Sequence, residues 1–498
     1  MKNAASTPIN IIWYKRDLRT TDHEPLCHAQ DEGLPLLAVY FMEPSVMNHP
    51  DSDPRHWRFA WQSFQALNSK ISAAGGRVYL FHREAEPVLE ILREHFTIKT
   101  VFSSQETGNS LTFRRDLRMA KWFQQRGIIW REFQNNGVIR GLNNRKNWDE
   151  RWHAYMNDKT RNADLHRIRW VHLDDALYHS LQGEPLPEVI TRQDASFQPG
   201  GEDWAWKYLE DFIRYRHIHY TRHISKPEKS RRSCSRLSPY LAYGNISLRS
   251  VYQYTLQNME GARNKSALSN FISRLHWHCH FIQKFESECR YEHENINRAY
   301  DALSKEFNEA YYHAWLHGKT GIPIVDACMR CLRATGYVNF RMRAMVVSFA
   351  VYNLWLDWRH IAQPLARLFL DYEPGIHYPQ LQMQSGTTGV NTLRIYNPVK
   401  NSEQHDPDGE FIKKWVPELA FVPGKLIHEP HRMSFLEQRM YNCIVGKDYP
   451  APIVSVEETR KRAADIMWAF KKKAEVKEEG KRILARHVRP RDGSVTGA

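Results

Sequence analysis

The stretch IIWYKRDLRTTDHEPLCHAQDEGLPLLAVYF, residues 11–41, begins and ends in a run of apolar residues. These two runs, Ile11–Tyr14 and Leu34–Phe41, are short and apolar, which is typical of buried strands. The pattern continues with three further predicted strands and two predicted helices, at Arg77–Phe81, Thr100–Ser103, Ile128–Phe133, Arg55–Ala74 and Ala85–Phe96. Strands that alternate with helices predict a parallel α/β sheet, whose ligands bind beyond the carboxyl ends of the strands.

The alternating pattern weakens after about residue 143, where Pro185, Pro187 and the stretch Gln198–Asp203 indicate a linker. From Trp204 onward long amphipathic segments dominate and strand signals nearly vanish, which predicts an all-helical second half. The predicted organisation is an α/β domain over residues 1–140, a linker over 141–203 and a helical domain over 204–498.

The composition narrows the class of protein. The 498 residues contain no apolar run of about 18 residues, so we expect no membrane span. The N-terminus lacks the apolar core of a secretory signal, and the seven cysteines have no disulfide-framework spacing. Both features favour a reducing compartment, and we expect a cytoplasmic monomer.

The charge indicates a polyanionic partner. The net charge is +14, and Lys and Arg that neutralise phosphates release counterions on binding. A merely basic protein is the alternative. The 16 Trp and 23 Tyr side chains suit stacked rings such as flavin or bases. The last stretch, residues 458–498, predicts a basic helix with a solvent-facing surface, followed by a tail that contains Pro and Gly.

Five segments, in this order, resemble the photolyase/cryptochrome family. They are WYKRDLRTTDHEPL (13–26), SRLSPYLAYGNIS (235–247), WLHGKTGIPIVDACM (315–329), GYVNFRMRAMVVSFAVYNLWLDW (336–358) and RIYNPVKNSEQHDPDGEFIKKW (394–415). The resemblance covers the chain from about residue 10 to residue 425. It implies an N-terminal α/β domain, a helical domain that binds FAD, and light-driven electron transfer to pyrimidine dimers in UV-damaged DNA.

Several residues are expected to bind the cofactor. Ser235, Arg236, Leu237 and Ser238 precede a predicted helix, and their hydroxyls, guanidinium and N–H groups suit a phosphate; an ordinary helix cap at Ser238 is the alternative. The resemblance assigns this segment to the FAD pyrophosphate. It also places five further residues near the cofactor: Tyr220, Arg343, Asp371, Glu373 and His377.

Arg343 and Asp371 resemble the family's ion pair beside the flavin ring, with a structural salt bridge as the alternative. Glu373 takes the place of a second family Asp. His377 falls where the family faces flavin N5 with Asn, Asp or Cys, and its charge there depends on pH. With Trp277, these residues form the predicted catalytic set: Trp277, Arg343, Asp371 and His377.

Trp277 matches the family tryptophan that flanks a flipped lesion, and a core tryptophan is the alternative. Arg341, Met345 and Met383 are the other predicted substrate contacts, with Met383 in place of a second tryptophan. Arg274, also assigned to the cofactor side of the pocket, stands where cyclobutane-dimer enzymes carry Glu.

Two other positions in the pocket depart from the family pattern: Phe340 replaces Asn, and His278 replaces Arg. Asn339-Phe340-Arg341 stands where the (6-4) enzymes carry a paired His motif. Cyclobutane dimers are therefore the favoured lesion, in an atypical pocket. A cryptochrome-like photoreceptor is the alternative function, and a redox flavoprotein without photochemistry is a third.

The electron-transfer chain also departs from the family. Trp358 matches the middle tryptophan, but its expected partners are Leu381 and a position near Lys305. Trp355, one helical turn before Trp358, is an alternative donor or a core residue.

The family often holds an antenna pigment in the α/β domain. Glu106 lies near the matching region, but nothing names the pigment. We expect no metal, because the Cys328–Cys331 pair lies in a helical segment and the alternate histidines of HWHCH (276–280) point in different directions on a helix.

Overall fold

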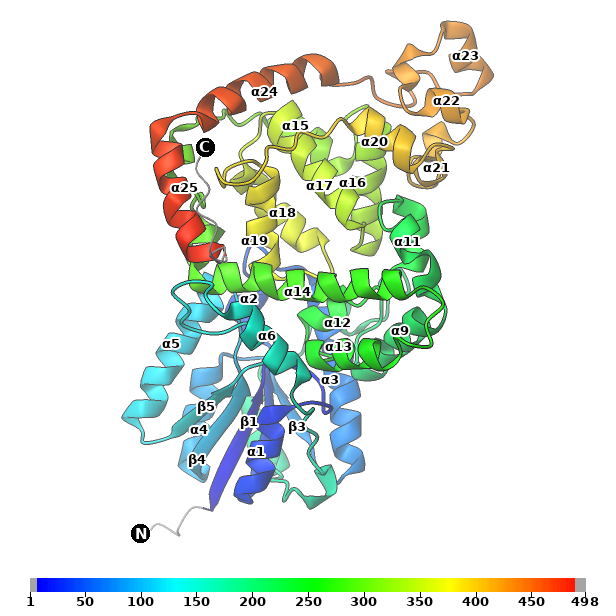
Figure 1. The fold of residues 1–498 in the computed structure, drawn as a ribbon. Helices are drawn as coiled ribbons and strands as arrows, with labels where there is room; N and C mark the ends of the chain where they lie inside the picture. The colour runs from blue at the N-terminus through cyan, green and yellow to red at the C-terminus, as the bar shows by residue number, and fades with distance from the viewer. Residues whose placement is uncertain (1–6, 489–498) are drawn as a thin grey trace.

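The computed structural model describes residues 7–488. Its N-terminal part holds one five-stranded sheet in the order β3-β2-β1-β4-β5, and all four pairings are parallel (Figure 1). The strands are β1 (Pro8–Tyr14), β2 (Leu36–Phe41), β3 (Val78–Phe81), β4 (Thr97–Ser104) and β5 (Ile129–Phe133). All five predicted strands and the α/β class are thus confirmed.

The chain winds in opposite directions from the centre of the sheet. β1 pairs with β2 on one side and with β4 on the other, so the segments that follow β1 and β4 diverge at their carboxyl ends. Such a switch point opens a crevice where ligands bind. The helices that accompany the strands are α1 (Glu24–Glu32), α2 (Pro44–Met47), α3 (Pro54–Ala73), α4 (Ala85–His95) and α5 (Ser110–Gln125).

The segment between the sheet and the helical half is well packed. It contains α6 (Trp148–Asn157), η1 (Leu165–Arg167), α7 (Asp175–Leu181) and α8 (Glu188–Thr191). Trp148 and Trp152 of α6 are buried in a core shared with the helices that follow. Whether residues 141–203 form a separate linker stays a prediction.

The second half is helical, as predicted. The elements of the helical half are α9 (Glu202–Arg214), η2 (Arg216–His219), α10 (Tyr220–His223), α11 (Pro227–Ser233), α12 (Ser238–Ala242), α13 (Leu248–Gln257), α14 (Lys265–Ser287), η3 (Cys289–Glu292), η4 (Arg298–Ala302), α15 (Glu309–His317), α16 (Pro323–Thr335), α17 (Phe340–Ser348), the π-turn η5 (Phe349–Asn353), α18 (Trp358–Leu368), α19 (Pro374–Gln384), α20 (Pro398–His405), α21 (Glu410–Trp415), η6 (Pro417–Leu419), α22 (Gly424–Ile427), η7 (Pro430–Arg432), α23 (Phe435–Met440), α24 (Val456–Lys471) and α25 (Ala474–His487). α14 crosses the middle of the molecule, with α15 to α19 on one side of it and α9, α12 and α13 on the side of the α/β part (Figure 1).

Local sequence signals set the ends of the helices that carry the site. Asn339 accepts a hydrogen bond from the N–H of Met342 and starts α17. Asp357 caps α18 in the same way, and Glu373 caps α19 through Gly375. Gly336 ends α16 as a left-handed C-cap, at φ 69. The caps of α17 and α19 therefore fix the two helices that carry the site.

The C-terminal expectation was wrong in one respect. α24 and α25 do not present a merely solvated face, because both bury apolar residues against the helical core, including Met467, Phe470 and Ile483. Figure 1 shows the two helices wrapping along the edge of the helical half. The predicted tail beyond residue 488 lies outside the described residues. Over residues 7–488, no helix is both long and apolar enough to cross a membrane.

Candidate functional site

A cavity of about 120 Å³ lies between α17 and α19. Its walls are largely apolar, with Val347, Phe369 and Leu381 among them. The polar side chains that line it are Arg343, Asp371, Glu373, His377, Gln380 and Gln384. Four of the predicted cofactor residues are thus brought together.

Arg343 and Asp371 form a two-pronged ion pair. Arg343 Nη1 donates to Asp371 Oδ1 at 3.0 Å, and Nη2 donates to Oδ2 at 2.9 Å. Arg343 Nε donates to the Val338 carbonyl at 2.8 Å, which fixes the guanidinium plane. Burial raises the pKa of Asp371, but the charge and hydrogen bonds of Arg343 outweigh it, so the pKa lies below its usual value. The Asp371 carboxyl is therefore ionised at neutral pH.

His377 lies in the same cavity as a neutral imidazole. Its Nε2 is 2.8 Å from the carbonyl oxygen of Ala362, which can only accept, so Nε2 carries the proton. Nδ1 is then an acceptor. Burial lowers the pKa of His377 to about 4, because the charged form loses its hydration.

Glu373 connects this cavity to the α/β part. Its Oε2 lies 3.3 Å from Arg16 Nη2, just after β1. Arg16 also donates from Nη2 to the Tyr372 carbonyl at 2.8 Å and from Nε to the Ala242 carbonyl at 2.8 Å. Arg16 thereby ties the end of the sheet to both α12 and α19.

The Ser235–Ser238 segment adjoins the ion pair. A hydrogen bond from the Ser238 hydroxyl helps to lower the pKa of Asp371, so this hydroxyl and the Asp371 carboxylate are neighbours. The alternative that Ser238 caps α12 is wrong: the N-cap is Leu237, and no side chain caps this helix. The hydroxyl of Ser238 is therefore not committed to the helix end.

Arg236 has an unusual backbone and an unpartnered donor. Its φ is 60, a left-handed conformation that L-residues seldom adopt and that is concentrated at functional sites. Its Nη2 donates to Gln198 Oε1 at 2.6 Å, and the guanidinium lies 3.7 Å from the centroid of the Tyr337 ring. Its buried Nε has no hydrogen-bond partner among the described residues. Burial lowers the pKa of Arg236.

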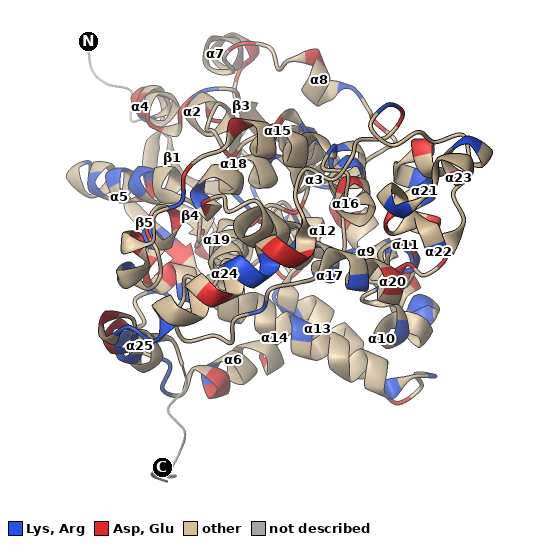
Figure 2. Ribbon diagram, turned by 90° about the horizontal axis from the view of Figure 1, so that it is seen from above, with Lys and Arg blue, Asp and Glu red and all other residues tan. Residues whose placement is uncertain are grey.

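The predicted lesion-side residues lie on α14 and at the start of α17. Trp277 is 48% exposed and stacks on Phe281 with ring centroids 5.8 Å apart, so it is not a core tryptophan. Tyr220 is buried, and a hydrogen bond from the exposed Arg274 reaches it. α14 is mostly uncharged along its length in Figure 2.

On α17, Phe340 is 52% exposed and also lines the cavity, which places it at the mouth. Arg341 is half-buried beside it, and Met383 is half-buried on α19. Met345 differs from the prediction: its side chain is fully buried in the helical core and lines neither cavity, so it does not contact a substrate directly.

Two family models match the chain, one described as DNA photolyase over residues 10–145 and one described as the FAD binding domain of DNA photolyase over residues 271–469. The chain belongs to the photolyase/cryptochrome family. A deoxyribodipyrimidine photo-lyase of Alkalihalophilus pseudofirmus is 28% identical over 92% of this chain and 97% of its own length. A cryptochrome DASH of Synechocystis is 27% identical over 91% of this chain and 97% of its own length. A class III photolyase structure from Agrobacterium tumefaciens superposes with a TM-score of 0.81 at 26% identity, covering 95% of this chain and 100% of that one.

The residues of the cavity fit the FAD of this family. Apolar walls at Val347, Phe369 and Leu381 suit a planar ring system. The unpartnered Nε of Arg236 and the hydroxyl of Ser238 suit a pyrophosphate. The left-handed backbone at Arg236 could not be predicted from the sequence, because an arginine does not indicate that conformation.

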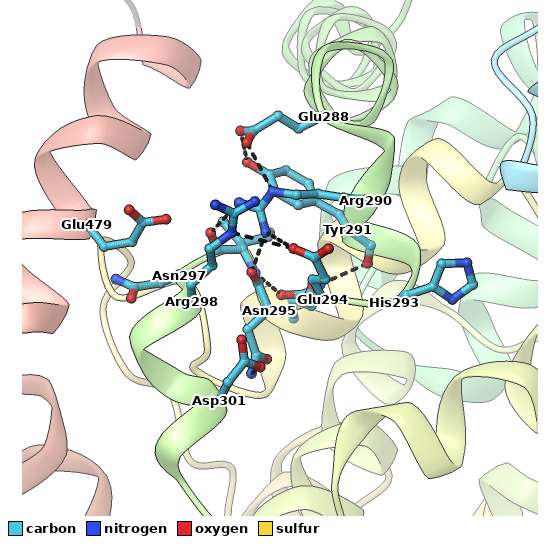
Figure 3. Close-up of polar contacts among 12 residues, drawn as sticks. Glu288, Arg290, Tyr291, His293, Glu294, Asn295, Asn297, Arg298, Asp301 and Glu479 are labelled. Atoms are coloured by element: carbon cyan, nitrogen blue, oxygen red, sulfur yellow. Dashed lines mark hydrogen bonds and ion pairs between the residues drawn. The ribbon is translucent and has the colours of Figure 1, made fainter.

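The two tryptophans predicted for electron transfer differ in burial. Trp358 is buried, and its Nε1 donates to Asn295 Oδ1 at 2.8 Å. Figure 3 shows Asn295 within a hydrogen-bonded loop that also holds Asp301. Trp355 has φ 56 and is half-buried beside Lys305. Leu381 lines the cavity where the family's flavin-proximal partner is expected.

A second cavity, also of about 120 Å³, opens at the switch point of the sheet. Glu106, named from the sequence, lines it together with Lys15, Glu43 and Arg115. Arg115 pairs with Glu43 at 2.6 Å and with Glu106 at 2.8 Å. The sequence analysis missed Lys15, Glu43 and Arg115, although Lys15 and Glu43 stand directly beyond predicted strands.

Over residues 7–488, no group of three or more His, Cys, Asp or Glu side chains has the geometry of a metal site. Cys328 and Cys331 are free and buried on α16.

Proposed function

We propose that this chain repairs UV-damaged DNA in a light-dependent reaction, splitting pyrimidine dimers with FAD as cofactor and acting as a monomer. The observation that supports this most is the Arg343–Asp371 pair in a largely apolar cavity, with the exposed ring of Phe340 at its mouth. Cyclobutane dimers are the favoured lesion. FAD, when bound, supplies light absorption and the electron that reaches the lesion.

The residues of the chain position the reactants. Arg343 holds a fixed positive charge at the cavity wall, where it stabilises negative charge on a neighbouring ring, and Asp371 keeps that guanidinium oriented. His377 offers an acceptor nitrogen without adding a charge at neutral pH. Ser235, Arg236, Leu237, Ser238 and Tyr220 are proposed to hold the rest of the cofactor.

The mouth of the cavity receives the substrate. A dimer must leave the base stack before it can reach a cofactor in a pocket. Trp277 presents a half-exposed indole face on which a flipped base can stack. Arg341, next to Phe340 on α17, supplies a positive charge for the DNA backbone, and Met383 offers a soft apolar wall.

The second cavity is the proposed site of an antenna chromophore. It lies at the carboxyl ends of the strands, as ligand sites of parallel sheets do. Its polar wall holds both charges, from Lys15, Arg115, Glu43 and Glu106. This mixture suits a polar heterocycle that donates and accepts hydrogen bonds.

A cryptochrome-like photoreceptor is the second candidate, because Arg274, Phe340 and Met383 change the lesion side of the pocket and because cryptochrome DASH proteins are among the relatives. Repair of defined lesions separates the two. Reduced protein is mixed with oligonucleotides that carry a cyclobutane dimer or a (6-4) product and is illuminated with blue or near-UV light. Light-dependent loss of the cyclobutane dimer supports the proposal. Flavin absorbance and photoreduction without loss of either lesion would favour the photoreceptor.

A further inference from the structure

A group of buried cations lies where the loop before α6 meets α14. Arg145 is 4% exposed and Lys284 is 8% exposed. Arg145 Nη2 donates to the backbone carbonyl of His280 at 2.9 Å, and His280 and Lys284 are one turn apart on the same face of α14. None of the three lines either cavity described above.

These cations have few polar partners, although the Arg145 guanidinium also lies 4.8 Å from the centroid of the Trp148 ring. Arg145 Nε and Nη1 are buried and make no hydrogen bond within residues 7–488. In the same part of the chain, the Lys284 ammonium has neither an ion-pair nor a hydrogen-bond partner, and the charge that acts most on it is the like charge of Arg145. Buried polar groups without partners are rare and often indicate an unseen ion.

Of the acidic residues of the neighbouring elements within residues 7–488, only Asp149 of α6 acts on the cations. It lies 3.0 Å from His276 Nε2, and its charge partly offsets that of Arg145 but does not act on Lys284. Glu286 at the end of α14 pairs with Arg140 at 3.1 Å.

Glu288, beyond α14, is the third nearby acid, and it is held by a different set of donors. It pairs with Arg290 at 3.2 Å and with Arg482 of α25 at 2.9 Å, and it also contacts His487 and the Tyr291 hydroxyl. Figure 3 shows Glu288 turned toward Arg290 and Tyr291. The cation group therefore has an excess of positive charge.

Burial of this excess is unfavourable without an anion. An unpaired buried charge costs several kcal/mol. Burial, reinforced by Arg145, lowers the pKa of Lys284 to about 8. Burial, Arg145 and Lys284 together also lower the pKa of His280. An anion would relieve this repulsion for every member of the group.

We propose that Arg145, His280 and Lys284 form a binding site for a dianionic phosphate group, either inorganic phosphate or the terminal phosphate of a small ligand. A phosphate has oxygens on several sides and nearly two charges at pH 7, so it accepts from separate donors and offsets more than one cation. A carboxylate neutralises only one. The His280 ring contacts the exposed Trp277 ring, with centroids 5.4 Å apart, so the site borders the surface.

The site is independent of the proposed repair activity, and its test needs neither light nor a lesion. Thermal unfolding of the FAD-loaded protein is followed in sodium phosphate and in sodium chloride of equal ionic strength at pH 7. Phosphate should raise the melting temperature by about 2 °C at a ten-fold excess over its Kd. Isothermal titration with inorganic phosphate should show one site.

Lys284→Met decides whether this lysine binds the anion. The variant should lose the phosphate-dependent increase, and in chloride it should melt no lower than the wild type, because an unpaired buried cation has been removed. Lys481→Met, at a 75% exposed side chain, is the control and should keep the full increase. Equal melting of the wild type in phosphate and chloride, or a retained increase in Lys284→Met, would overturn the site.

Two further arms identify the source of the phosphate. Titration with a nucleoside monophosphate should show binding comparable with that of inorganic phosphate, and Lys284→Met should abolish both. An undamaged oligonucleotide without terminal phosphates carries only diesters, and it should leave inorganic phosphate bound. Displacement of phosphate by that oligonucleotide alone would assign the cations to the DNA backbone and contradict the proposal.

Discussion

Lys305 Nζ lies 4.5 Å from the centroid of the Trp355 ring and donates to the Val351 carbonyl at 2.6 Å. The lysine thus satisfies a carbonyl of the π-turn η5 and places a cation against the one tryptophan that adjoins Trp358 in sequence. Burial lowers the pKa of Lys305 to about 7. Lys305, which lies against Trp355, therefore changes its charge within the physiological pH range.

Lys305→Met should flatten the pH dependence of stability above neutrality. Between about pH 7 and 10 the unfolded chain binds the Lys305 proton and the native protein does not, so the free energy of unfolding rises with pH. We expect the wild type to gain about 1–2 kcal/mol more than the variant between pH 6.5 and 9. Urea unfolding at the two values measures this. An equal slope in both proteins would contradict the lowered pKa.

Asp371→Asn should weaken FAD binding at least about ten-fold. In the native protein both Asp371 oxygens accept hydrogen bonds from the Arg343 guanidinium. An asparagine offers only one carbonyl oxygen and no negative charge, so the charge of Arg343 is no longer neutralised. The ratio of flavin to protein absorbance after dialysis measures the loss. Asp371→Glu keeps the charge and serves as the matched variant, which should retain more flavin. Equal flavin content in all three proteins would make the pair a structural salt bridge only.

His377→Asn should make the protein less sensitive to acid. The pKa of His377 is about 4 in the native protein and about 6.5 in an unfolded chain, so protonation favours unfolding as the pH falls from 6.5 toward 4. At pH 5 this one group costs about 2 kcal/mol relative to pH 7. Chemical unfolding at pH 7 and pH 5 should show a smaller loss in the variant. His179→Asn, at an exposed histidine, is the control and should match the wild type.

The sequence predicted the sheet because each strand is a short apolar run bounded by polar residues, as in Ile11–Tyr14. The same reasoning failed for α24, although Ala463, Met467 and Phe470 recur at helical spacing, because charged residues between them masked the buried stripe. Arg145 and His280, joined by a hydrogen bond, are 135 positions apart. Their meeting does not follow from local pattern.

The residues around the cavity also divide into features that the sequence predicts and features that it does not. Arg343, Asp371, Glu373 and His377 were named from motifs, and they meet because α17, α19 and the segment before α19 place them around one space. Met345 stands two positions after Arg343 on α17, where the helical period turns its side chain into the core. The motif predicts where Met345 lies along the chain but not which way its side chain points.

Trp277→Ala should lose recognition of damaged DNA while the fold is kept. The indole is 48% exposed, so its removal sacrifices little core packing. Stacking of a base on an aromatic side chain contributes about 1–3 kcal/mol, so the preference for an oligonucleotide with a cyclobutane dimer over the undamaged one should fall about 5- to 150-fold. Fluorescence anisotropy with both oligonucleotides measures the ratio. The slope of affinity against salt should stay unchanged, because no phosphate contact is removed. Trp204→Ala removes a tryptophan of similar exposure, 40%, from α9 and should bind both oligonucleotides as the wild type does. A preference that survives in Trp277→Ala, or that falls equally in Trp204→Ala, would place the lesion elsewhere on the molecule.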